Sequence, residues 1–257
     1  MNYVQTNVKD RIGYIILNRL EKRNALNAEF VNELKSTLKS YEDQNEVRAI
    51  VLKSSGETFC AGADLEYLQQ LQNYTFEENL TDSHGLAALF KLIYAFPKPV
   101  ITIVNGPAIA GGCGLATVGD FCFASPASTF GYTEARIGFI PAIVTIFLKK
   151  KVNETISKKL VMTGETFSAA KAFNYGLITE IVEPDIMDAY VHEWVVKLIH
   201  NSSSNSLKMI KEMYCTLGYT SLDEDIRYAC YMNATARETD DCKKGISAFL
   251  SKQKISW

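Results

Sequence analysis

The sequence of 257 residues lacks several features that would place it in a special class of protein. It contains no run of about 18 apolar residues, which excludes a membrane-spanning helix. Its first segment, "MNYVQTNVKDRIGYIILN", lacks the basic stretch, apolar stretch and cleavage site of a secretory signal, so we expect a cytoplasmic protein. The formal net charge is only -2, and we therefore expect neither a nucleic-acid nor a membrane partner.

Patterns for metal binding, disulfides and nucleotide binding are also missing. The six cysteines form no CxxC pair and there are only three histidines, so we expect no metal site and thiols that stay reduced. No glycine-rich stretch fits GxGxxG or a lysine-containing phosphate loop. Hydrophobic residues make up 47% of the chain, which is ordinary for a globular protein.

What is present is an alternation of strand-like and helix-like segments. "RIGYIILN" and "VRAIVLK" are β-branched runs that predict strands, and "NAEFVNELKSTLKSYED" between them predicts a helix capped by Asn27. Five apolar residues of that helix fall on one stripe: Phe30, Val31, Leu34, Leu38 and Tyr41. A further helix near 80–95 and the strand "PVITIV" follow. Strands alternating with helices favour parallel βα units.

The second half is expected to be mainly helical. Ser168 is expected to cap a short helix that stops at Gly176, and "GLITEIVE" predicts a last strand. Four helices are expected after it, over 185–200, 202–218, 220–236 and 238–252. The sequence thus predicts an α/β core with a helical C-terminal extension.

Two glycine-containing turns, "FCAGADL" and "NGPAIAGGCGLA", each follow a predicted strand. Strand ends in successive parallel units lie at one edge of a sheet, so both turns are expected at one pocket. Small residues let backbone N–H groups approach a ligand, and two such groups would polarise a carbonyl oxygen. The alternative is that the glycines only permit tight packing.

Together these motifs resemble the crotonase superfamily, the enoyl-CoA hydratases and isomerases. The resemblance runs in order through "LNRLEKRNALN", "FCAGADL", "KPVITIVNGPAIAGGCGLATVGDFCFAS", "FGYTEARIGFIP", "MTGETFSAAKAFNYGLITEIV" and "GISAFLSKQK". It implies a spiral of ββα units over residues 1–200 and a helical trimerisation region over 201–257. "FGYTEARIGFIPAIV" looks most like the branch of methylglutaconyl-CoA hydratases.

The resemblance also implies a set of site residues. Ala63 and Gly111 match the two backbone donors to the thioester oxygen, and Glu134 matches a catalytic glutamate whose apolar neighbours predict a raised pKa. The alternative interpretation of Glu134 is a surface residue on a loop without a catalytic role. Further residues matched to the substrate pocket are Ala61, Asp64, Leu65, Gly114 and Ile140, and those matched to coenzyme A binding are Lys22, Arg23, Ala25, Phe249 and Lys252. The basic residues among them have a second interpretation as solvated side chains.

Gly114 makes the reaction ambiguous, because hydratases of this family usually carry a second glutamate there. We expect hydration of a short branched or carboxylated 2-enoyl-CoA first, and double-bond isomerisation by one carboxylate second. A third hypothesis is a catalytically silent acyl-CoA binding protein. A serine hydrolase is disfavoured, because nothing places a serine beside a base. The resemblance further implies a homotrimer or hexamer, and no cofactor, since coenzyme A is part of the substrate.

Overall fold

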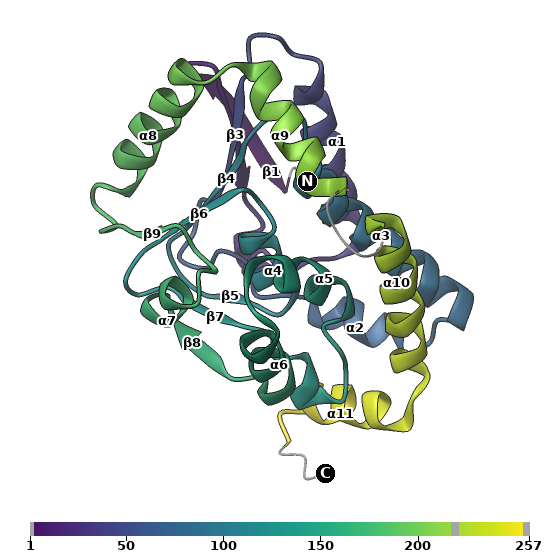
Figure 1. Cartoon of the computed structure of the whole chain (residues 1–257). Coiled ribbons are helices and arrows are strands. Elements are labelled where there is room, and N and C mark those ends of the chain that lie inside the picture. Colours follow the sequence, from purple (N-terminus) through teal and green to yellow (C-terminus); the bar gives the residue numbers. More distant parts are fainter. Residues whose placement is uncertain (1–2, 217–220, 254–257) are drawn as a thin grey trace.

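The computed structural model describes residues 3–216 and 221–253. Its centre is a six-stranded sheet in the order β1-β2-β3-β4-β6-β9 (Figure 1). β1 and β2 form an antiparallel hairpin, and the other neighbours pair in parallel. The strands span Val4–Lys9 (β1), Ile12–Leu17 (β2), Ala49–Ser54 (β3), Val100–Val104 (β4), Phe121–Ala124 (β6) and Glu180–Ile181 (β9).

The first crossover helix forms as its sequence predicts. α1 spans Ala28–Glu42, and the Asn27 side chain accepts a hydrogen bond from the backbone N–H of Phe30. The five predicted stripe residues are its buried residues. This face packs on one side of the sheet, in a large apolar core shared with α3 (Phe76–Tyr94).

A three-stranded sheet lies beside the first. It consists of β5 (Ala108–Ile109), β7 (Thr129–Gly131) and β8 (Thr166–Ser168). From β4 to β9 the chain passes back and forth between the two sheets, as expected for a spiral of ββα units. The intervening helices are α2 (Leu65–Leu71), α4 (Gly111–Thr117), α5 (Ala142–Lys151), α6 (Glu154–Thr163) and α7 (Ala169–Asn174), with short 3-10 turns η1 (Leu20–Lys22) and η2 (Glu134–Ile137).

Four helices complete the chain: α8 (Met187–Asn201), α9 (Ser204–Thr216), α10 (Leu222–Glu238) and α11 (Asp240–Leu250). α8 covers the opposite face of the large sheet and forms a second apolar core with it. α10 runs beside α3, and α11 closes the lower end of the molecule (Figure 1). The C-terminal helices therefore pack on the core of their own chain.

The α/β class and the spiral are confirmed, and several predicted boundaries need correction. The last strand is only Glu180–Ile181, because the segment before it is a turn that follows α7. Ser168 caps α7 as predicted, and Gly176 has a φ of +74° just beyond its end. Some predicted positions lie outside the described residues. They are 217–218 at the end of one expected helix, 220 at the start of the next, and 254–257 in the expected C-terminal region.

Two further observations concern helix length and the cysteine side chains. In the described ranges, no helix is both long and apolar enough to cross a membrane. All six cysteines are free thiols. Burial raises the pKa of Cys60 and Cys113, which stand in the two glycine turns, to about 12, so both thiols stay protonated near neutrality.

Candidate active site

The two glycine turns meet, as their positions after neighbouring strands predicted. Cys60 forms a parallel bridge with Ala108, and the backbone N–H of Ile109 donates to the Cys60 carbonyl at 3.0 Å. A Cβ atom on Gly112 would lie 2.2 Å from that carbonyl oxygen. The close approach of the turns therefore requires glycine at position 112.

The strained residue of the second turn is an alanine and not a glycine. Ala110 has φ 51° and ψ -125° immediately before α4, a conformation that L side chains rarely adopt. Its N–H donates to the Gly131 carbonyl at 2.6 Å, and its carbonyl accepts from Cys113 at 2.9 Å. These bonds hold a conformation that turns the chain sharply into the helix, and such strain is typical of functional sites.

Both predicted backbone donors are available at this point. In the bridge between Leu26 and Ala63, the Leu26 N–H donates to Gly62 and the Leu26 carbonyl accepts from Asp64. The Ala63 N–H is directed away from that pairing, and Gly111 begins the first turn of α4. Neither N–H donates a hydrogen bond to any residue within 3–216 or 221–253.

Glu134 is the titratable group of this site. Only 8% of the residue is exposed, and its Oε2 atom has no hydrogen-bond partner among the described residues. Burial raises its pKa from 4.5 to about 7, as the apolar neighbours predicted. The interpretation of Glu134 as a surface loop residue is therefore wrong, and its carboxyl is suited to proton transfer near neutrality.

A single cavity of about 1020 Å³ joins these groups. Ala63, Gly111 and Glu134 line it together with the predicted pocket residues Ala61, Leu65 and Ile140. Further walls come from the start of α1 and from α2, α3, α5, α10 and α11. The volume is sufficient for a drug-sized ligand.

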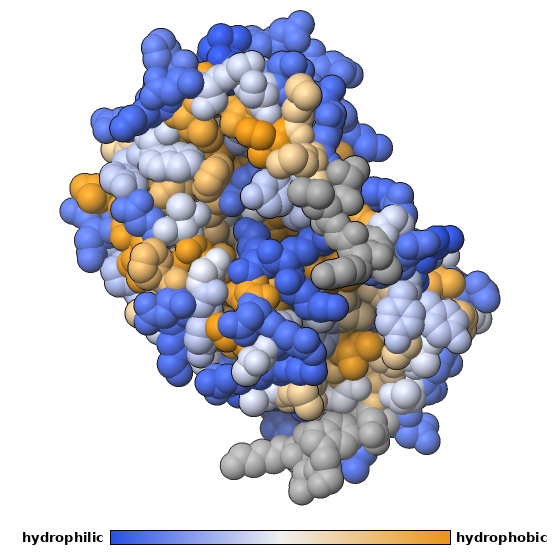
Figure 2. Space-filling view, in the orientation of Figure 1, coloured by the Kyte–Doolittle hydropathy of each residue, from blue (hydrophilic) through white to orange (hydrophobic). Residues whose placement is uncertain are grey.

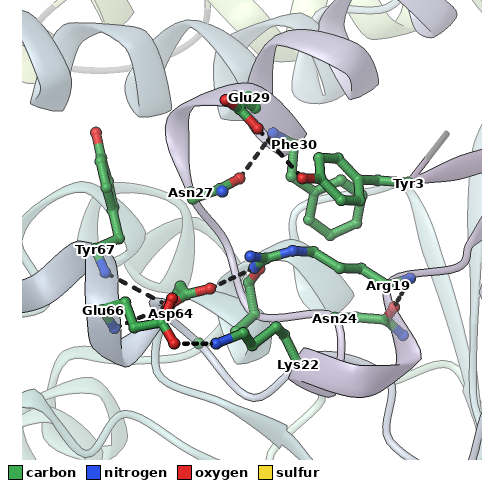
Figure 3. Close-up of polar contacts among 12 residues, drawn as sticks. Tyr3, Arg19, Lys22, Asn24, Asn27, Glu29, Phe30, Asp64, Glu66 and Tyr67 are labelled. Atoms are coloured by element: carbon green, nitrogen blue, oxygen red, sulfur yellow. Dashed lines mark hydrogen bonds and ion pairs between the residues drawn. The ribbon is translucent and has the colours of Figure 1, made fainter. Parts of the chain in front are cut away.

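Asp64 is a correction to the predicted pocket. It does not line the described cavity but lies 2.6 Å from Arg19, and both side chains are buried (Figure 3). Its carboxylate also accepts from the backbone N–H groups of Glu66 and Tyr67 and so caps α2. Burial opposes ionisation, but Arg19 and these N–H groups outweigh it and lower the pKa of Asp64. Asp64 therefore fixes the turn that presents Ala63.

Gly114 is a second correction. It is buried inside α4 and does not line the cavity that the described residues enclose. A Cβ atom on it would lie 2.2 Å from Cγ1 of Val144 and 2.8 Å from Cε1 of Phe90. Val144 itself lines the cavity, so a valine occupies the space that a side chain at 114 would need.

The residues matched to coenzyme A binding are spread more widely. Phe249 lines the cavity, whereas Ala25 does not; Ala25 is buried and its carbonyl accepts from Arg19 at 2.8 Å. Lys22 lies 2.5 Å from Glu66 (Figure 3), and Arg23 and Lys252 are exposed with positive φ. Within the described part of one chain, Lys22, Arg23 and Lys252 stay outside the lining, and their role stays a prediction.

Several lining residues were not predicted from the sequence. Val144 on α5, Tyr67 on α2, Asp82 on α3 and two polar residues of α10, Asn233 and Arg237, all face the cavity. Asn233 lies about 100 residues after Glu134 in the helix predicted over 220–236, and Arg237 directly follows that range. Polar residues in such a position ordinarily indicate a solvated face. Only the packing of α10 on α3 brings them to the site.

Comparison with known proteins agrees with this architecture. The model of the enoyl-CoA hydratase/isomerase family matches residues 7–257. A Thermus thermophilus protein assigned to the enoyl-CoA hydratases is 37% identical over 95% of this chain and 96% of its own. A crotonyl-CoA hydratase of Syntrophomonas wolfei is 29% identical over 97% and 95%. The crystal structure of an enoyl-CoA hydratase from Mycobacterium avium has a TM-score of 0.88 and 30% identity, covering 100% of this chain and 99% of that one.

Proposed function

Because the chain belongs to the enoyl-CoA hydratase/isomerase family, we propose that it hydrates a short 2-enoyl-CoA thioester. The observation that carries the proposal is the buried carboxyl of Glu134, with its pKa near 7, in the same cavity as the N–H groups of Ala63 and Gly111. These are the two elements that the chemistry requires: donors for a developing enolate oxygen and an acid that protonates carbon.

The steps balance with a single carboxyl group. Ala63 and Gly111 donate to the thioester oxygen while the oxygen of a water molecule bonds to C3, and the double bond becomes a single bond. Protonated Glu134 gives its proton to C2, and the proton that the water loses returns to Glu134. Each donor contributes about 2.7 to 4 kcal/mol by analogy with other oxyanion holes.

For the acyl group we propose a short branched chain ahead of a carboxylated one such as methylglutaconyl. The cavity wall on α3 carries the exposed carboxylates of Glu77 and Glu78, which repel an anionic acyl group. Arg237 is already paired with Asp82 at 2.8 Å. A carboxylate would have to use Arg136, which is exposed, lines the cavity and forms no ion pair with a described residue.

Isomerisation is the second candidate, and Val144 favours it. With a valine in the space beside Gly114, the wall there is apolar and offers no second carboxylate. Moving a proton along an allylic system needs one carboxylate that acts first as base and then as acid. In that reaction Glu134 must start ionised, whereas hydration as written above needs it protonated.

An absorbance assay of thioester turnover over about pH 5.5 to 8.5 separates these candidates. Its substrates are crotonyl-CoA, 3-methylglutaconyl-CoA and a 3-enoyl-CoA. Hydration predicts consumption of the 2-enoyl thioesters with kcat/KM falling as pH rises through about 7. If only the 3-enoyl thioester is turned over, with kcat/KM rising as pH rises through about 7, the protein is an isomerase and not a hydratase. Thioester binding without any turnover would instead identify a silent binding protein.

We also propose the remaining expectations for the whole protein: a homotrimer or hexamer, a cytoplasmic location and no cofactor besides the coenzyme A of the substrate. Exposed apolar side chains on the last helices support an assembly, namely Met209, Ile210, Met213, Tyr214, Tyr228 and Tyr231. Figure 2 shows apolar residues interrupting the hydrophilic surface of the face drawn. Six free thiols suit a reducing compartment. The assignment of 201–257 as the trimerisation region stays a prediction.

A further inference from the structure

We propose that the α3–α10 corner of the cavity, lined by Asp82, Asn233 and Arg237, binds an uncharged hydrogen-bond donor on the acyl chain, such as a hydroxyl group. Asn79 and Ser83 contact these residues from α3. This inference rests on the proposed function in one respect, that the cavity takes acyl-CoA thioesters. It adds a chemical class for the part of the acyl group beyond the reacting carbons.

The first observation is an unsatisfied amide. Asn233 lines the cavity, is only 4% exposed, and its Oδ1 atom has no hydrogen-bond partner in the described part of the chain. Its Nδ2 donates to Oγ of Ser83 at 3.2 Å, which fixes the amide against α3. Less than 1 Å² of Oδ1 is exposed, so a ligand reaches this atom only when the amide turns from Ser83 towards the cavity. A ligand that donates to it there removes the cost of a buried acceptor without a partner.

The second observation is that the cation of this corner is already engaged. Arg237 lies 2.8 Å from Asp82 through Nη2, and Nη1 donates to the carbonyl and to Oδ1 of Asn79, both at 3.1 Å. The guanidinium also stacks over the ring of Phe139. Arg237 therefore links α10 to α3 and does not present a free charge to an acyl carboxylate.

The charges around the corner also disfavour an anion. The Tyr67 hydroxyl donates to the other oxygen of Asp82, so that this carboxylate is held by Tyr67 and Arg237 together. Glu77 and Glu78, on the first turn of α3, add two carboxylates to the lining. With the charges of Asp82 and Arg237 cancelling, the corner itself is neutral, and the further charges of the lining on α3 are negative.

There is room for an acyl substituent at this corner. Gly85, one turn along α3 from Asp82, lines the cavity, and a Cβ atom built on it would have no neighbour within 4 Å. The open space at Gly85 lies near the unsatisfied acceptor of Asn233 and the ion pair of Asp82 with Arg237. This combination favours a polar, uncharged group on the ligand. A purely apolar chain would leave Asn233 unpaired, and a carboxylate would meet like charges.

Calorimetric binding of saturated thioesters tests the inference without any turnover. Each ω-hydroxyacyl-CoA of four to six carbons is compared with the unsubstituted acyl-CoA of equal heavy-atom count, and with succinyl- and glutaryl-CoA. We expect at least one hydroxylated member to bind roughly fivefold to tenfold more tightly than its methyl counterpart, and the dicarboxylic thioesters to bind most weakly.

Asn233→Leu is the matched variant, because it keeps the volume and removes the acceptor. It should abolish the preference for the hydroxyl, measured as the ratio of the two dissociation constants within the variant, because both ligands then meet an apolar side chain. No hydroxyl preference in the wild type, a preference that survives in the variant, or tightest binding of a dicarboxylic thioester each overturns the inference. Failure of hydration leaves it standing, whereas failure to bind any thioester overturns both proposals.

Discussion

At the scale of single residues, the candidate site contains a carboxyl group whose ionisation is suppressed by burial. Glu134 is buried without a cation or a hydrogen-bond donor at Oε2 among the described residues, so its neutral form is favoured up to about pH 7. Asp64, only 3% exposed, is the opposite case, because Arg19 and two backbone N–H groups keep it ionised. The first carboxyl is available for chemistry and the second holds the turn.

The raised pKa of Glu134 predicts a gain in stability when the charge is removed. Because the folded-state pKa of about 7 exceeds the ordinary 4.5, the folded state binds the proton more tightly. Stability is therefore lost as pH rises from about 4.5 to 7. Glu134→Gln should be more stable than the wild type at pH 8, on the order of 2–3 kcal/mol, and nearly equal at pH 4.5.

Thermal or urea unfolding at the two pH values measures this difference. Glu57→Gln is the control, since Glu57 is exposed and the same exchange of carboxylate for amide at the surface should change the free energy of unfolding little. A Glu134→Gln protein no more stable than the wild type at pH 8 would mean that Glu134 is not desolvated in the folded state.

At the scale of elements, the decisive feature is the contact between two turns that lie some 50 residues apart in the chain. Local patterns predicted the elements well, as the buried stripe and the Asn27 cap of α1 show. They did not predict which neighbour each glycine of the second turn accommodates, because these neighbours come from distant parts of the chain. Gly112 accommodates the carbonyl of Cys60, Gly114 accommodates Val144, and the positive φ falls on Ala110.

Two neighbouring glycines provide a matched test of this contact. Gly112→Ala places a Cβ 2.2 Å from the Cys60 oxygen and should destabilise the protein by about 3 kcal/mol or more. Gly111→Ala has only Leu26 at 3.5 Å as its nearest neighbour and should fold normally. Urea unfolding of both variants measures the difference. Equal stabilities would contradict the proposed packing of the turns.

At the scale of the whole molecule, the fold class was predictable because alternating periodicities identify parallel βα units. The contribution of α10 to the cavity lining was not predictable, because a helical sequence pattern does not indicate which element of the core the helix will pack against. The docking of α10 on α3 brings Asn233 to Ser83 and Arg237 to Asp82, across about 150 residues of sequence. The corner of the cavity between α3 and α10 is therefore a product of tertiary structure alone.

The exposed apolar side chains of α9 and α10 lead to a prediction about assembly. Met209, Tyr214, Tyr228 and Tyr231 are all more than half exposed in one chain, and burying them between subunits is favourable. Light scattering at micromolar concentration should give the mass of a trimer or hexamer of the 28.7 kDa chain. A monomer at that concentration would contradict the assembly and the role of these helices in it.

The most direct test of the account is the rate of 2-enoyl-CoA hydration by the wild type and by Glu134→Gln. The amide keeps the size of the side chain but has no proton to deliver to C2, so kcat should fall by about 10²-fold or more. In the wild type, kcat/KM should decline as pH rises through about 7. A Glu134→Gln enzyme that keeps wild-type turnover would show that proton transfer does not depend on Glu134 and would contradict the proposed mechanism.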